Sequence, residues 1–182
     1  MSAEGHMSEC PTAIVIAQPG RRGWALEEAW DLAATVSRGH IFVKESRFPG
    51  VILLFARGSS PLDVSRAAAR MEFGFVQRIV PSVSCFKASS EGEVLEKLRD
   101  VLRSLRPAGK YRVFFSLRGS GKSIVGKSRV EELLRSTGVV PARGSSRGIA
   151  VESVDDVFIF SIGIIRACGS RCILLYYRGV YG

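Results

Sequence analysis

The sequence predicts an α/β (α+β) protein whose expected strands and helices fall into two successive groups. Apolar runs typical of strands alternate with helical patterns along the chain, which is characteristic of this fold class. The 182 residues suffice for one medium domain or two small ones, and the apolar share of 46% allows a sizeable core. A break near residues 81–88 is the expected boundary between the two groups.

The first group is expected to form a β-α-β-β-α-β unit over residues 12–87. Apolar residues at helical spacing indicate its first helix, while Ser60 and Pro61 supply an N-cap and a proline at the first position of its second helix. This order is the ferredoxin-like arrangement, in which two helices cover one face of an antiparallel sheet. Residues 1–11 are expected to be a flexible tail. The expected strands are 12–17, 40–44, 50–56 and 75–80, and the expected helices are 24–36 and 61–71.

The second group covers residues 88–182. Ser90 and Glu93 indicate the start of its first helix, and Gly138 closes its second helix at the C′ position. The segments between these helices and the strands are expected to be loops, and the first of them is rich in glycine and serine. The expected helices are 90–105 and 128–137, the strands are 110–117, 148–152, 157–165 and 172–178, and the loops are 118–126 and 139–147.

Nearly all of the net charge of +9 is concentrated in one quarter of the chain. Residues 106–149 contain ten Lys or Arg and only two acids, which is a net charge of +8. Such a surface suits a polyanion, because each phosphate that it neutralises releases condensed counterions. The alternative is a soluble basic protein without a polyanionic partner. The sequence therefore predicts one basic, glycine-rich face that grips a phosphate backbone.

Residues 121–128 match the phosphate-loop pattern G-x-x-x-x-G-K-S, between an expected strand and an expected helix. However, Ile124 and Val125 are β-branched, whereas a nucleotide cradle favours glycine and small residues. Asp155 and Asp156 precede a strand instead of following one, so they are badly placed to hold magnesium. The segment is therefore expected to bind phosphate at a helix N-terminus without hydrolysing a nucleotide.

Catalytic and metal-binding patterns have little support in the sequence. The two histidines, His6 and His40, do not combine with other residues into a catalytic arrangement. Cys168 and Cys172 are expected to flank a turn, with a local disulfide left open, while Cys10 and Cys85 would complete a zinc site with them only by coincidence. No cofactor and no metal are expected. Three tyrosines near the C-terminus, together with Arg178, are candidate platforms for base stacking, although ordinary packing is the commoner role of such tyrosines. They are Tyr176, Tyr177 and Tyr181.

The second half resembles a THUMP domain. The resemblance is carried by residues 111–118 (YRVFFSLR), 128–134 (SRVEELL) and 151–162 (VESVDDVFIFSI), with residues 75–88 similar to the segment that joins a ferredoxin-like domain to THUMP. It implies a ferredoxin-like domain followed by a THUMP domain with a mixed sheet and flanking helices. It also implies a tRNA-binding adaptor without activity of its own, whose partner is a tRNA cytidine acetyltransferase or another RNA-modification enzyme.

Ten basic residues are the expected RNA contacts. Arg118, Lys122 and Arg129 match basic positions of the strand-loop-helix motif in the THUMP family, and the other seven follow from the placement of charge. The complete set is Lys110, Arg112, Arg118, Lys122, Lys127, Arg129, Arg143, Arg147, Arg166 and Arg171.

Two other functions stay open. One is a nucleotide-binding enzyme that uses residues 121–128, and the other is a generic basic RNA-binding module outside RNA modification. No secretory signal is visible, and the longest apolar run is far shorter than the roughly 20 residues that span a bilayer. No membrane partner is therefore expected, and the expected location is the cytoplasm.

Overall fold

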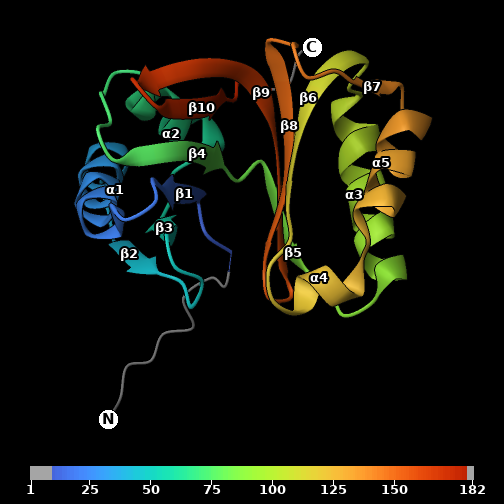
Figure 1. The fold of residues 1–182 in the computed structure, drawn as a ribbon, viewed down its shortest axis with the longest axis horizontal. Helices are drawn as coiled ribbons and strands as arrows, with labels where there is room; N and C mark the ends of the chain where they lie inside the picture. Colours follow the sequence, from blue (N-terminus) through green and yellow to red (C-terminus); the bar gives the residue numbers. More distant parts are fainter. Residues whose placement is uncertain (1–9, 180–182) are drawn as a thin grey trace.

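One continuous, strongly curved sheet organises residues 10–179, the part of the chain that the computed structural model describes (Figure 1). The expected tail at residues 1–11 falls almost entirely outside this part. In the described residues the strand order is β2-β3-β1-β4-β10-β9-β8-β6-β7, with β5 paired to β9. The elements of the first half are β1 (Ala13–Ala17), α1 (Arg22–Val36), β2 (Ile41–Glu45), β3 (Val51–Ala56), α2 (Pro61–Ala68) and β4 (Val76–Pro81). The elements of the second half are β5 (Ser84–Lys87), α3 (Glu91–Leu105), β6 (Gly109–Ser116), α4 (Ser120–Ile124), α5 (Lys127–Ser136), β7 (Val139–Pro141), β8 (Arg147–Val154), β9 (Val157–Gly169) and β10 (Cys172–Tyr176).

The helices lie on the outside of the molecule and the two halves of the sheet meet on the inside. Helices α1 and α2 pack on the first half, while α3 and α5 pack on the second half at the opposite end of the molecule (Figure 1). The bare faces of the two half-sheets meet in a third apolar cluster, where Ile14, Leu53 and Val80 lie with Phe114 and Ile159. Burial of apolar surface between these two inner faces therefore holds the two halves together.

Neighbouring strands among the first four are antiparallel. Strand β1 pairs with β3 on one side and β4 on the other, and β3 also pairs with the edge strand β2. The second half is mixed, because β6 runs parallel to β7 and β8 while β8 and β9 are antiparallel. The mixed α/β class expected from the sequence is thus confirmed.

Strand β10 returns from the second half of the chain into the first half of the sheet. It pairs in parallel with β4 and antiparallel with β9, and Leu174 is fully buried in the core under α1 and α2. Conversely, β5 ends at Lys87 but pairs with β9 of the second half. A division of the chain between residues 87 and 88 therefore assigns β5 to the first part although it pairs in the sheet of the second, and β10 to the second part although it also pairs with β4 of the first.

Two segments that were expected to be loops contain regular structure. Helix α4 lies in the expected loop 118–126, and β7 lies in the expected loop 139–147, so the expectation of loops there was wrong. Strand β5, which no expected element covers, lies in the expected boundary at residues 81–88. These elements are short, and β5 and β7 are completed by partners distant in sequence, which local patterns do not reveal.

The capping patterns expected from the sequence begin α2 and α3. The Ser60 hydroxyl accepts a hydrogen bond from the Asp63 amide at 3.1 Å, and the Asp63 carboxylate accepts one from the Ser60 amide at 2.8 Å. Ser90 likewise accepts from the amide of Glu93, whose carboxylate accepts from the Ser89 amide at 2.7 Å. These backbone hydrogen bonds, with those from the serine hydroxyls, hold the pKa values of Asp63 and Glu93 below their ordinary values.

All four cysteines form disulfide bonds. Cys168 pairs with Cys172 across the β9–β10 turn, and Cys10 pairs with Cys85 of β5. The first bond is the local one left open by the sequence, whereas the second was not anticipated from the sequence. The amide of Ser82 donates a hydrogen bond to the Thr12 carbonyl at 2.9 Å, so the chain before β1 lies beside the segment that leads into β5. This contact between distant segments brings the two sulfur atoms together.

Candidate nucleic-acid interface

The ten expected RNA contacts do not lie on one face, because strand β6 separates them into two main groups. Strand β6 has eight residues and spans about 23 Å at the usual rise of a strand. The α4–α5 group lies beyond its C-terminal end and consists of Arg118, Lys122, Lys127 and Arg129. The β6-start group lies around its N-terminal end and includes Lys110, Arg112, Arg143 and Arg147. Arg166 and Arg171 belong to neither group: Arg166 lies on β9, two residues beyond Ile164, which pairs with Arg147, and Arg171 lies in the β9–β10 turn.

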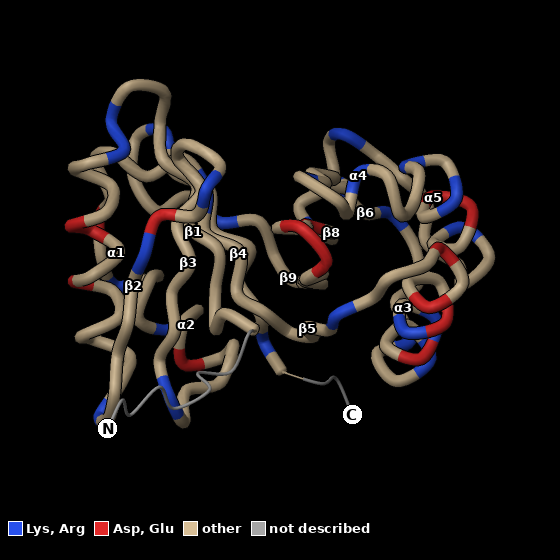
Figure 2. Tube along the Cα trace, turned by 90° about the horizontal axis from the view of Figure 1, so that it is seen from below, with Lys and Arg blue, Asp and Glu red and all other residues tan. Residues whose placement is uncertain are grey.

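Acidic residues accompany most of the α4–α5 group. Arg129 forms ion pairs with Glu91 at 3.2 Å and Glu132 at 2.8 Å, and Lys127 lies 3.6 Å from Glu131. The two contacts of Arg129 raise its pKa, with the hydrogen bond to Glu91 as the largest cause. Figure 2 shows this end of the molecule, where acidic and basic positions alternate along α3 and α5. The mixed charge makes this end a weaker attractant for a polyanion than the sequence count suggests.

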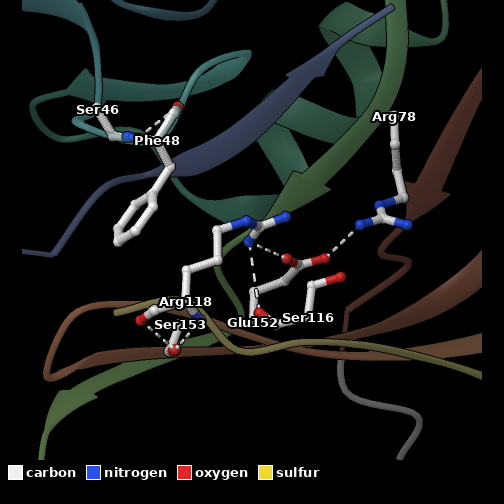
Figure 3. Close-up of polar contacts among 7 residues, drawn as sticks. All are labelled: Ser46, Phe48, Arg78, Ser116, Arg118, Glu152 and Ser153. Carbon is white, nitrogen blue, oxygen red and sulfur yellow. Dashed lines mark hydrogen bonds and ion pairs between the residues drawn. The ribbon is translucent and has the colours of Figure 1, made fainter. Parts of the chain in front are cut away.

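Arg118 takes part in a buried ionic cluster between the two halves. Its guanidinium donates to one carboxylate oxygen of Glu152 at 2.7 Å, while Arg78 of β4 donates to the other at 2.7 Å (Figure 3). The Glu152 side chain is completely buried, and the two arginine side chains keep only about a fifth of their exposure. Arg118 and Arg78 therefore neutralise a buried carboxylate, a structural role that the sequence did not indicate.

The segment that matches a phosphate-loop pattern is folded as a helix and packs against the protein. Gly121 lies in α4, where its carbonyl accepts a hydrogen bond from Val125, and its Cα faces Ser153 so closely that a Cβ would overlap the Ser153 side chain. Gly119 has φ +64° and lies against Asp155 and Arg47 in the same way. Both glycines permit contact with the β8–β9 turn and do not form an open cradle of backbone amides.

The N-terminus of α5 is a weaker form of the anion site that the sequence predicts. Gly126 caps this helix without a side-chain hydrogen bond, and Lys127 and Arg129 occupy its first turn without an acid. Both cations form ion pairs with neighbouring carboxylates, Lys127 with Glu131 and Arg129 with Glu91 and Glu132. The partial positive charge of a helix N-terminus is present, but the surrounding charge is balanced.

The β6-start group is free of carboxylate partners within residues 10–179. Lys110, Arg112, Arg143 and Arg147 are exposed, and none of them forms an ion pair in this part of the chain. Arg112 lies over the ring of Phe114, with its guanidinium carbon 4.8 Å from the ring centroid. Cations of this kind lose little when they bind phosphate, because no internal ion pair has to be broken.

A pocket of about 560 Å³ opens beside the β6-start group and adds two arginines that are not among the ten expected RNA contacts. Arg106 caps the C-terminus of α3, and Arg178 follows β10; both are exposed and neither is ion-paired in the described residues. Arg147 and Tyr111 also line the pocket. Arg106 belongs to the basic quarter of the chain and could have been included, but Arg178 is 29 residues beyond it and reaches the pocket only through the return of β10.

The candidate stacking tyrosines have separate environments. Tyr177 lines the pocket, while Tyr176 lies under the guanidinium of Arg166, at 4.4 Å from ring centroid to carbon. Tyr181 lies outside the described residues. Tyr177 therefore lies with Arg106 and Arg178 in the pocket, whereas Tyr176 contacts Arg166 and does not line the pocket.

Membrane and metal sites are not found in the described part of the chain. No helix there is long and apolar enough to cross a membrane. No group of three or more His, Cys, Asp or Glu side chains is arranged there to hold a metal ion.

Comparison with known proteins gives a likeness of fold. No family model matches the sequence, and no curated protein matches it. Among solved structures, PH1313 from Pyrococcus horikoshii Ot3 is similar with a TM-score of 0.54 and 18% identity, over 88% of this chain and 56% of that chain. TrmN from Thermus thermophilus is similar with a TM-score of 0.53 and 16% identity, over 82% of this chain and 44% of that chain. The chain thus spans about half the length of the solved proteins that it resembles, and their likeness supports the THUMP-like fold expected from the sequence.

Proposed function

We propose that this protein binds structured RNA, most specifically tRNA, through the β6-start group enlarged by Arg106 and Arg178. The observation that carries the proposal is the concentration of six exposed cations around one end of the second half, none of which is ion-paired within residues 10–179. Arginine forks suit phosphate oxygens, and the lack of competing carboxylates among these described residues favours a polyanion over an acidic protein patch. The THUMP resemblance of residues 111–162 supports tRNA as the RNA.

The protein would act as a non-catalytic adaptor that presents tRNA to a modification enzyme. The sequence resemblance names a cytidine acetyltransferase as the partner. The chain matches about half of each similar solved protein, so chemistry supplied by another domain or chain is consistent with the proposal. In this proposal residues 12–87 are a ferredoxin-like domain, which the antiparallel order β2-β3-β1-β4 supports.

The nucleotide-binding enzyme is a weaker candidate. Its loop would have to unfold α4 and separate Gly121 from Ser153 before the backbone could surround a phosphate. The generic RNA-binding module differs from the main proposal only in its partner. The proposed cytoplasmic location has to accommodate two disulfides, which persist inside cells mainly in proteins of hyperthermophiles.

The salt dependence of tRNA binding tests the proposal. The triple variant Lys110→Ala, Arg112→Ala, Arg143→Ala removes three cations of the β6-start group. We expect the slope of log K against log salt concentration to fall by about two to three units, since each lost phosphate contact contributes roughly one. Filter binding at several salt concentrations measures this slope.

Two further variants serve as controls of equal charge. Arg38→Ala, Arg57→Ala, Arg70→Ala removes three exposed cations of the first half and should leave the slope nearly unchanged. Lys122→Ala, Lys127→Ala, Arg129→Ala should reduce it by less than one unit. An unchanged slope in the β6-start variant would refute the assigned surface. Magnesium-dependent ATP binding by the isolated protein would favour the enzyme instead.

A further inference from the structure

The pocket beside the β6-start group, here called the arginine pocket, combines a flat cationic surface with an apolar wall. Ile162 and Ile164 of β9 line one side, and Arg147 with Tyr111 lines another. Its volume of about 560 Å³ lies within the range of small-ligand sites. A surface that only neutralised phosphates would need no such cavity.

The guanidinium group of Arg147 lies over the Tyr111 ring. The guanidinium carbon lies 4.4 Å from the ring centroid, and one guanidinium nitrogen donates to the Ala108 carbonyl at 3.1 Å and to the Tyr111 hydroxyl at 3.4 Å. Arg147 as a whole remains exposed. A guanidinium fixed on one face by an aromatic ring offers its other face as a stacking platform for a planar base.

The charged side chains that line the arginine pocket are all cationic. Arg106 and Arg178 approach it from the end of α3 and from the segment after β10, and no carboxylate of residues 10–179 lines it. Backbone contacts hold this last segment in place: the Tyr177 amide donates to the buried Ser65 hydroxyl at 3.0 Å. Gly163 helps as well, because a side chain there would overlap the Tyr176 carbonyl and push the segment off β9.

We propose that the arginine pocket holds one unpaired nucleotide of the bound RNA, with the base stacked on the Arg147 guanidinium and the adjoining phosphate bound by Arg178 and Arg106. This inference rests on the proposed function and adds a contact to a base to the contacts with phosphates. An inorganic anion would leave the isoleucine wall exposed, and an apolar ligand would bury three unpaired charges. A nucleotide has both the flat apolar body and the anionic group that the two parts of the pocket match.

Two hairpin RNAs that differ only in their bases test the proposal. Both carry the same four-nucleotide single-stranded tail, but one tail is abasic, so that the phosphates are equal in number. Fluorescence anisotropy should show that the wild-type protein binds the tail with bases at least fivefold more tightly, as expected for the loss of one stacked base. Equal affinity for the two hairpins would overturn the inference.

Conservative variants locate the effect. Arg147→Lys keeps the charge but removes the planar group, so it should abolish the preference for bases while the abasic hairpin still binds. Arg57→Lys, an exposed residue of the first half, is the matched control and should keep the preference. Tyr177→Leu is a second test and should also reduce the preference for bases. The hydrogen bond from the backbone amide of residue 177 to Ser65 remains in this variant, so only the aromatic ring is lost. A preference that survives both pocket variants would overturn the assigned site. Failure of the wild type to bind either hairpin at low salt would instead overturn the proposed function itself.

Discussion

Removal of the buried carboxylate at Glu152 should destabilise the protein strongly. In the variant Glu152→Ala, Arg78 and Arg118 lose the acceptor that each contacts at 2.7 Å and remain as two like charges at the junction of the halves. Breaking a buried ion pair from one side costs about 3–5 kcal/mol. Each arginine side chain keeps about a fifth of its exposure, so water can solvate part of the charge. We therefore expect the free energy of unfolding to fall by an amount at the lower end of this range, about 3 kcal/mol.

This loss is a large part of the roughly 5–15 kcal/mol that stabilises a typical protein. For a chain of this size it corresponds to a decrease in Tm of about 6–12 °C. Differential scanning calorimetry and denaturant unfolding, each with wild type and variant side by side, measure the change. The variant Glu152→Gln keeps the side-chain volume and one acceptor oxygen, so its stability should lie between those of the wild type and Glu152→Ala.

The triple variant Arg78→Met, Glu152→Leu, Arg118→Met separates charge from packing. It removes all three ionic groups and should recover much of the stability lost in Glu152→Ala, because apolar groups of similar volume often replace a buried ion cluster without loss. If Glu152→Ala unfolds within about 1 kcal/mol of the wild type, the cluster is effectively hydrated and the reasoning fails. A triple variant less stable than Glu152→Ala would also contradict it.

Three other perturbations have defined outcomes. The double variant Cys10→Ser, Cys85→Ser opens a loop with a sequence separation of 75 and should lower the free energy of unfolding by about 4 kcal/mol on the chain-entropy estimate, which guanidinium unfolding measures; a loss below about 1 kcal/mol would contradict it. Because the pKa values of Asp63 and Glu93 are lowered in the folded state, their stabilisation is complete above their unfolded pKa values and disappears as the pH falls through the folded ones. Asp63→Asn with Glu93→Gln should therefore flatten the acid limb of stability below about pH 4.5, and an unchanged limb in the pH-dependent unfolding curves would count against the caps. Gly121→Val should lower Tm by several degrees with no nucleotide present, since its side chain meets the β8–β9 turn; unaltered thermal unfolding would restore the phosphate-loop interpretation.

Local signals in the sequence predicted most helices and strands, because each depends on neighbours along the chain. The Ser60 and Ser90 caps determine where α2 and α3 begin, and both caps are present. Strand β7 and the Cys10–Cys85 bond were missed because each depends on a partner that only the folded sheet brings near. No periodicity in a single segment contains that information.

The basic quarter of the chain shows how closeness in sequence differs from closeness in space. Lys110 and Arg118 are only eight residues apart, but β6 is extended and carries them to opposite ends of the second half. A helix would have kept them within a few turns of each other. Arg178 and Arg147, in contrast, are 31 residues apart and line the same pocket, because β9 and β10 fold back. Charge counts along the chain therefore identify the half that carries the proposed polyanion-binding surface but do not identify its face.

The glycines of residues 119–121 illustrate why a motif has to be judged by its contacts. In a phosphate loop, glycine allows the backbone to approach a ligand; here it allows the backbone to approach Ser153 at the end of β8 and Asp155 of the β8–β9 turn. Ser153 directly follows Glu152, and its hydroxyl accepts a hydrogen bond from the Arg118 amide at 3.0 Å. Close packing at Gly121 thus fixes the backbone from which Arg118 reaches Glu152. The same letters that match a nucleotide site serve here to position a buried ion cluster, so substitutions at Gly121 should impair stability before they affect any binding of phosphate.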